Sequence, residues 1–149
     1  MNHTAHRRPL LMVCAFVLVL AACGSGSKSG GGGSVNVKMR EYEFTFDRGE
    51  WPSGAVEVTV DNVGAIPHEM YLVRTKTVGS LPRKADGTVD KDKIAPADLV
   101  TVVPAMPAGT SQTVTVQLTP GTYVAVCNIV NADGTMHFMK GMHMIITVK

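Results

Sequence analysis

Residues 118–127 read LTPGTYVAVC, and this stretch decides the fold prediction. Pro120-Gly121 marks a tight turn, because proline presets its backbone angle and glycine adopts conformations that other residues avoid. The run that follows, Thr122–Cys127, is rich in the β-branched and aromatic residues that favour strands. A similar run, Thr113–Leu118, precedes the turn. The stretch therefore predicts a β-hairpin whose second strand ends in a cysteine.

The same strand pattern extends outward from this hairpin in both directions. Short runs rich in Val, Ile, Thr, Tyr and Phe predict further strands at Glu41–Asp47, Ala55–Asp61, His68–Arg74, Leu99–Val103 and His143–Lys149. Turn signals containing Pro, Gly or Asn separate several of them. About seven or eight short strands with such turns predict an all-β fold, a β-sandwich with Greek-key connections. Thr75–Ala97 departs from this rhythm, and we expect an excursion with a turn of helix near Asp90–Ile94.

The first segment has the layout of a bacterial export signal. Arg7 and Arg8 form a basic start, Leu10–Leu20 is apolar, and small residues precede Cys23. The apolar run is shorter than the roughly 20 residues that span a bilayer. The ending Leu20-Ala21-Ala22-Cys23 resembles a lipobox, which implies cleavage before Cys23 and lipidation of that residue. The alternative is a plain secretory signal in which Cys23 is incidental.

Composition predicts the domain organisation and excludes some functions. Residues 24–34 are mostly glycine and serine and predict a flexible tether. We therefore expect a signal peptide at 1–22, the lipidated cysteine and tether at 23–34, and one domain at 35–149. The net charge of +2 comes from Arg7 and Arg8, so the mature chain lacks the basic excess of nucleic-acid-binding proteins. The length suits one hydrophobic core and excludes a multidomain enzyme.

Only one cysteine remains in the expected domain. Cys14 lies within the signal and Cys23 is assigned to the anchor, so Cys127 has no partner in a compartment that usually pairs cysteines. An unpaired cysteine there is a buried small side chain, a reactive nucleophile or a metal ligand. The same part of the chain holds three histidines, at positions 68, 137 and 143.

Soft metal-ligand side chains gather near the carboxyl end. Cys127, His137 and Met142 lie in or beside one loop between two predicted strands, and His68 begins another strand. Two imidazoles, a thiolate and a weak thioether form the donor set of a blue copper site, whereas zinc sites use more thiolates. We therefore expect these four residues to bind one copper ion. His143 is expected to be a non-ligand, because neighbouring side chains of a strand point to opposite faces.

Three motifs together resemble the cupredoxins of the plastocyanin and azurin type. Residues 62–68, NVGAIPH, are similar to the segment that leads to the family's first histidine ligand. Residues 118–127 are similar to its Pro-Gly-x-Tyr strand into the cysteine, and the spacing of His137 and Met142 matches its closing His-x4-Met. The resemblance covers Val35–Lys149. It implies a cupredoxin-like sandwich with one type 1 copper ion, and Met142 as the weak axial ligand.

Two features depart from the family pattern. Glu69 stands where the family often has an asparagine that ties two loops together. The loop from Cys127 to His137 is also longer than in the small electron carriers of the family. These departures leave the path of the loop open.

The resemblance implies a carrier of single electrons and not an enzyme. The ring edge of His137 would be exposed as the electron exit, within an apolar patch of Met136, Phe138, Met139 and residues 65–67. We expect a monomer, anchored to the extracytoplasmic face of a bacterial membrane, whose transient partners are membrane respiratory complexes. The alternative is a copper(I) trafficking protein that binds through His68-Glu69-Met70 and His137-Phe138-Met139.

Overall fold

The computed structural model describes Met1 and residues 32–149. The predicted signal peptide, the lipidation of Cys23 and most of the tether therefore lie outside the described residues. In the described part of the chain, no helix combines the length and the apolar character needed to cross a bilayer.

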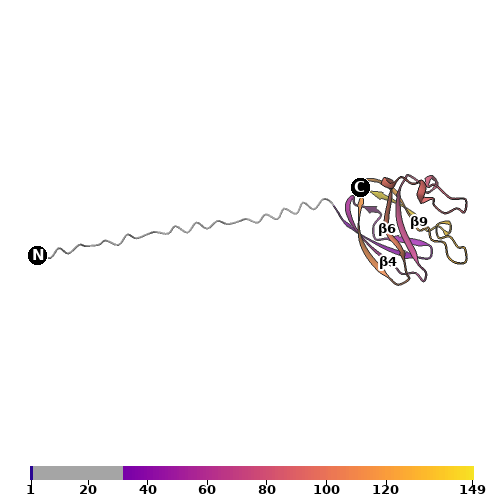
Figure 1. Ribbon diagram of the computed structural model, residues 1–149, viewed down its shortest axis with the longest axis horizontal. Coiled ribbons are helices and arrows are strands. Elements are labelled where there is room, and N and C mark those ends of the chain that lie inside the picture. The colour runs from indigo at the N-terminus through magenta and orange to yellow at the C-terminus, as the bar shows by residue number, and fades with distance from the viewer. Residues whose placement is uncertain (2–31) are drawn as a thin grey trace.

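Two β-sheets form the domain (Figure 1). The first sheet has the strand order β2-β1-β4-β7, and its strands are β1 (Ser34–Arg40), β2 (Glu43–Phe46), β4 (Gly54–Asn62) and β7 (Ser111–Leu118). The second has the order β3-β9-β8-β5-β6, and its strands are β3 (Glu50–Trp51), β5 (His68–Arg74), β6 (Leu99–Met106), β8 (Gly121–Val126) and β9 (His143–Val148). β1 with β4 and β3 with β9 are parallel pairs, and the other pairs are antiparallel. The predicted all-β sandwich is confirmed.

The amino-terminal strands of the domain differ from the prediction. β1 was not expected, although Val35, Val37 and Met39 alternate with polar residues and are fully buried. Its start at Ser34 lies one residue inside the expected tether, and the carbonyl of Gly33 already accepts the N–H of Glu57 at 2.9 Å. The expected strand 41–47 shrinks to β2, because a turn occupies residues 41 and 42. β3, of two residues, was also missed, so the described residues form nine strands.

The main core lies between the two sheets and extends to the carboxyl end of β8. It contains the buried aromatic residues Trp51 and Tyr123, together with Cys127 and Met142. The hydroxyl of Tyr123 donates to the carbonyl of Thr119 at 3.1 Å across the turn before β8. This bond fixes the entry of β8, and therefore the direction in which the strand delivers Cys127.

The excursion, residues 75–97, covers the outer face of the second sheet. It contains the short 3₁₀ turns η1 (Val78–Ser80) and η2 (Lys91–Lys93), and η2 falls where a helical turn was expected. Leu81 and Val89 are buried in a second apolar cluster with side chains of β5 and β8. Lys91 of η2 is exposed, and its Nζ lies 4.8 Å from the centre of the Tyr71 ring.

Candidate metal centre

Three predicted ligands meet at one end of the second sheet. His68 is the first residue of β5, Cys127 directly follows β8, and His137 lies in the loop that leads to β9. The antiparallel register pairs Tyr71 with Val126, so the start of β5 lies beside the end of β8. The three ligand side chains are fully buried, and their possible ligand atoms all lie within 4.8 Å of one another. We call these three side chains the donor cluster.

The separations within the donor cluster match a three-coordinate metal ion. Nδ1 of His68 lies 3.1 Å from Nδ1 of His137, and Sγ of Cys127 lies 4.0 Å and 3.3 Å from these two nitrogens. A point equidistant from three atoms with these separations lies about 2 Å from each, and metal bonds to imidazole and thiolate are about 2.0–2.3 Å long. Two nitrogens and a soft sulfur in this arrangement suit a copper ion.

Burial favours the uncharged form of all three donors in the metal-free protein. Desolvation raises the pKa of the Cys127 thiol to about 11, against the opposing effect of the N–H groups of Glu69 and Ile129. Desolvation likewise lowers the pKa of His68, although the Glu41 carboxylate opposes the shift, and it lowers the pKa of His137, which also faces His68. The neutral imidazoles are already in the form that binds a metal ion, whereas the thiol must lose its proton. The charge of a bound cation would stabilise the resulting buried thiolate.

Met142 is fully buried beside the donor cluster. Its main-chain N–H donates to the carbonyl of His137 at 3.0 Å, and its carbonyl accepts the N–H of Cys127 at 3.1 Å. These two bonds tie the residue to two members of the donor cluster. Its role as the axial ligand remains a prediction. Met144 is 38% exposed, and His143 lies against Phe138 with ring centres 5.0 Å apart, outside the donor cluster.

The loop before His68 is held by side chains on both of its sides. Asn62 is buried, accepts the N–H of Gly64 at 3.1 Å and donates to the carbonyls of Ile66 and Met106, at 2.9 Å each. Glu41, which belongs to none of the motifs in the sequence, accepts the main-chain N–H groups of Ala65 and Ile66 in this loop. The N–H of Glu41 itself and those of the loop hold the pKa of its carboxyl below the ordinary value.

Glu69 connects the start of β5, which carries His68, to the end of β8, which leads to Cys127. Its N–H donates to Sγ of Cys127 at 3.5 Å, and its carboxylate accepts the N–H of Asn128 at 3.1 Å. The glutamate therefore makes the connection that the family pattern assigns to asparagine at this position. Lys91 of the excursion lies 3.9 Å from the same carboxylate, so the charge of Glu69 is partly balanced.

The excursion braces the ligand loop, residues 128–142. Arg83 lies over the ring of Phe138, with 4.5 Å from the guanidinium carbon to the ring centre, and donates to the thioether of Met139 at 3.5 Å. A side chain at Gly87, where φ is +89°, would come within 3.1 Å of the same thioether. Figure 1 shows the excursion and the ligand loop extending from the same side of the sandwich. The excursion therefore contacts the long loop, whose path the sequence left open, at Phe138 and Met139.

The expected exposure of His137 is wrong. Its side chain is fully buried, Nε2 lies 2.9 Å from Oδ1 of Asn131, and the ring of Tyr42 packs against it edge-on with centres 5.0 Å apart. Phe138, expected in an exposed apolar patch, is buried in the second cluster, whereas Met139 is 56% exposed. Asn131 covers the histidine because the long loop folds back, and Tyr42 covers it from the turn between β1 and β2. The local sequence reveals neither contact.

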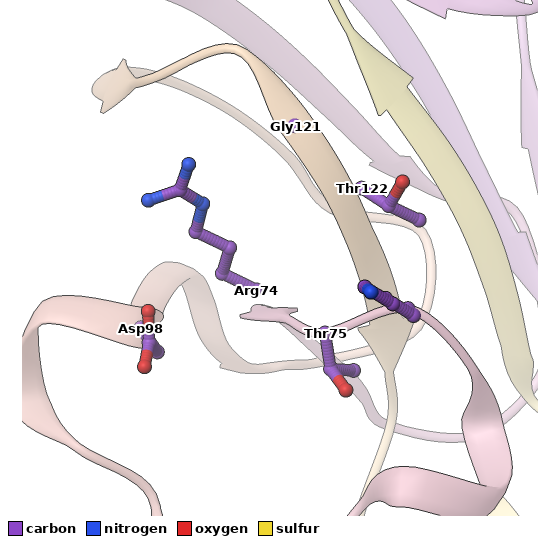
Figure 2. Close-up of a pocket in the computed structure, with 6 residues that line it drawn as sticks. Arg74, Thr75, Asp98, Gly121 and Thr122 are labelled. Atoms are coloured by element: carbon purple, nitrogen blue, oxygen red, sulfur yellow. The ribbon is translucent and has the colours of Figure 1, made fainter.

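A separate surface depression of about 400 Å³ lies far from the donor cluster. Figure 2 shows Arg74, at the end of β5, and Thr122, near the start of β8, at its edge. Because β5 begins and β8 ends at the donor cluster, these residues mark the opposite end of the sheet. The residues around the depression include no histidine or cysteine, so it contributes nothing to the metal centre.

Sequence comparisons find no known family that matches the chain and no curated relative. Solved structures do match. Reduced auracyanin from the photosynthetic bacterium Roseiflexus castenholzii is 20% identical, with a TM-score of 0.51 over 79% of this chain and 96% of that one. Rusticyanin from Thiobacillus ferrooxidans is 20% identical, with a TM-score of 0.52 over 78% and 77%. The fold is that of the cupredoxins. A second rusticyanin structure, described as that of a copper protein, gives 21% identity and a TM-score of 0.53 over 78% of both chains.

These structural matches, at sequence identities near one in five, show the cupredoxin fold but do not identify the ligands of this chain. The ligand argument therefore rests on this chain's own donor cluster. In this cupredoxin fold, strands β5 and β8 deliver His68 and Cys127, and the ligand loop delivers His137. The sequence resemblance predicted these three residues, and the structure brings them together. The sequence resemblance did not reveal Glu41 or Asn131, since their contacts to the histidines depend on how the chain folds.

Proposed function

We propose that this protein is a type 1 copper protein that transfers single electrons and catalyses no reaction of a substrate. The observation that carries the proposal is the convergence of two histidine Nδ1 atoms and one cysteine Sγ at a buried point, with separations that fit one metal ion. The cupredoxin fold supports it, and a structural neighbour is described as a copper protein. Another neighbour was studied in a dithionite-reduced form, which is consistent with redox chemistry.

We assign the ligand roles by donor chemistry. His68, Cys127 and His137 form the strong equatorial set, and Met142 is the weak axial ligand. Bound copper supplies a one-electron couple, since soft sulfur suits the reduced ion and imidazole nitrogen suits the oxidised ion. The protein holds these donors by main-chain hydrogen bonds and a packed core. A donor set that barely moves between the two oxidation states favours rapid electron transfer.

The buried position of His137 changes the expected route for electrons. We infer that electrons enter or leave at the end of the sandwich that holds the donor cluster, through the residues that cover His137. The loops at this end expose three apolar side chains, Val63, Val130 and Met139, at 46%, 46% and 56%. We propose that these exposed apolar side chains contribute to a transient protein contact. The partners are proposed to be membrane respiratory complexes, by analogy alone.

The location is proposed from the sequence. Lipidation of Cys23 would anchor a monomer to the extracytoplasmic face of a bacterial membrane, and the tether would let the domain reach redox partners on the same surface. This arrangement needs no contact between the domain and the lipid.

Copper(I) trafficking without Cys127 is less well supported by the geometry. Met70 is fully buried in the core, and the thioether of Met139 is within 3.5 Å of the Arg83 guanidinium. Met70 is therefore not accessible for exchange of an ion, and the exposed Met139 thioether is engaged by Arg83. The donor cluster, by contrast, includes the thiol.

The visible absorption spectrum of the copper(II)-loaded protein tests the proposal. An intense blue band requires a copper–thiolate bond, so the wild-type protein should turn blue with one equivalent of copper and Cys127→Ser should stay colourless. A matched control, Cys23→Ser, should keep the colour. A wild-type protein that binds copper(I) but gives no blue band with copper(II) would overturn the electron-transfer assignment and favour trafficking.

A further inference from the structure

The carboxylate of Glu41 is built into the loop that precedes His68. Glu41 lies in the turn between β1 and β2. Its Oε1 accepts the N–H of Ala65 at 2.5 Å and that of Ile66 at 3.0 Å. A side chain at Gly64 would come within 2.6 Å of this oxygen and 3.1 Å of the Cα of Arg40. Glycine at position 64 therefore leaves room for the carboxylate, so the two distant segments can make this close contact.

The same oxygen faces the outer nitrogen of His68. Nε2 of His68 is buried, has no hydrogen-bond partner among the described residues, and lies 3.7 Å from Oε1 of Glu41. Nδ1 points toward Cys127 and His137, so Nε2 must carry the ring proton whenever Nδ1 binds a metal ion. A buried N–H needs an acceptor, and the Glu41 carboxylate is in place to become one after a small shift.

The second histidine has a different partner. Nε2 of His137 lies 2.9 Å from the amide oxygen of Asn131, which is neutral. One imidazole of the donor cluster is therefore supported by an amide and the other by a carboxylate. The outer partner of a metal-bound histidine fixes its tautomer and raises its basicity, and a carboxylate does so more strongly than an amide.

We propose that Glu41 is a positioning residue for the metal centre: it accepts the Nε2–H of His68, keeps Nδ1 free for the ion, and favours the oxidised metal through its negative charge. The copper part of this inference rests on the proposed function. The tautomer part concerns the protein with or without metal.

Nitrogen-15 NMR of the metal-free protein tests the positioning role. Wild-type His68 should be in the Nε2–H tautomer. Glu41→Gln keeps an acceptor oxygen for the N–H groups of Ala65 and Ile66 but removes the charge, and it should increase the Nδ1–H population of His68. Glu41→Asp keeps the charge but shortens the side chain, and should shift the tautomer in the same direction. An unchanged tautomer in both variants overturns the positioning role.

The reduction potential of the copper-loaded protein tests the charge effect. Glu41→Gln should raise the potential, because the oxidised ion loses a nearby negative charge. Glu57→Gln is the matched control: it makes the same charge change on an exposed residue that pairs with Ser34, toward the opposite end of β4. Equal potentials in Glu41→Gln and wild type overturn the charge effect. If wild-type protein forms no copper–thiolate band, the proposed function fails, while the NMR result still decides whether Glu41 positions His68.

Discussion

The side-chain amide of Asn128 pairs with the main chain of Val89 as a strand neighbour would: Oδ1 accepts the N–H at 2.8 Å and Nδ2 donates to the carbonyl at 3.0 Å. Asn128 follows Cys127 directly, and Val89 belongs to the excursion. The excursion thus contacts the residue next to the predicted thiolate ligand.

Asn128→Ala should destabilise the protein by about 2 kcal/mol, since it removes both bonds and leaves two main-chain groups of Val89 unpaired. Urea unfolding of the metal-free protein measures the loss. Asn36→Ala is the control, because it removes one exposed bond to Asp47 and should change the free energy of unfolding by less than about 0.5 kcal/mol. Equal effects of the two substitutions would contradict the bracing role of the excursion.

Met142→Gln should keep copper and colour but lower the reduction potential, because an amide oxygen stabilises copper(I) less than a thioether does. Voltammetry of the loaded protein measures the shift, and about 59 mV corresponds to a tenfold change in the one-electron equilibrium. Met144→Gln is the control and should be silent, since its side chain is partly exposed. If Met144→Gln moves the potential and Met142→Gln does not, the axial assignment is wrong.

Metal loading should release one proton from Cys127 near neutral pH. The thiol is protonated there because burial raises its pKa to about 11, whereas the two ligand histidines are already neutral because their pKa values are lowered. Affinity should therefore rise about tenfold per pH unit from neutrality toward the thiol pKa. Calorimetry with zinc, which is not redox-active, in buffers of different ionisation enthalpy counts the proton. Binding without proton release would exclude the thiolate.

Met139→Lys should slow electron self-exchange between two copies of the copper protein several-fold, because it places a charge on the apolar end that we propose for docking. NMR line broadening in mixtures of the two oxidation states measures this rate. Ile145→Lys is the control: Ile145 is similarly exposed, at 52%, but lies on β9 beyond the ligand loop. A larger effect of Ile145→Lys would place the electron-transfer surface elsewhere.

Cys23→Ser should release the protein from membranes into the soluble fraction, because it removes the residue proposed to carry the lipid. Fractionation of cells that express each form measures the change. Cys14→Ser, within the predicted signal, serves as the control and should leave the distribution unchanged. Membrane association that survives Cys23→Ser would refute the anchor.

Local sequence predicted most of the sandwich, since strand periodicity and turn residues act over a few positions. The run that ends in Cys127 and the turn before it form β8 and its entry as expected. β1 carries the same alternation, with Val35, Val37 and Met39 buried, but it was not among the expected strands. β3 has two residues, too few for any periodic signal, and forms only because Glu50 and Trp51 pair with β9.

The sequence alone determined the donor types, because soft sulfur and imidazole at the spacing of Cys127 and His137 suit few other sites. Tertiary structure decided what surrounds them. The burial of His137, the carboxylate of Glu41 facing His68 and the brace at Asn128 join segments that are distant along the chain or folded back on themselves. Such contacts leave no periodic pattern in the residues, because packing of whole strands and loops brings them together.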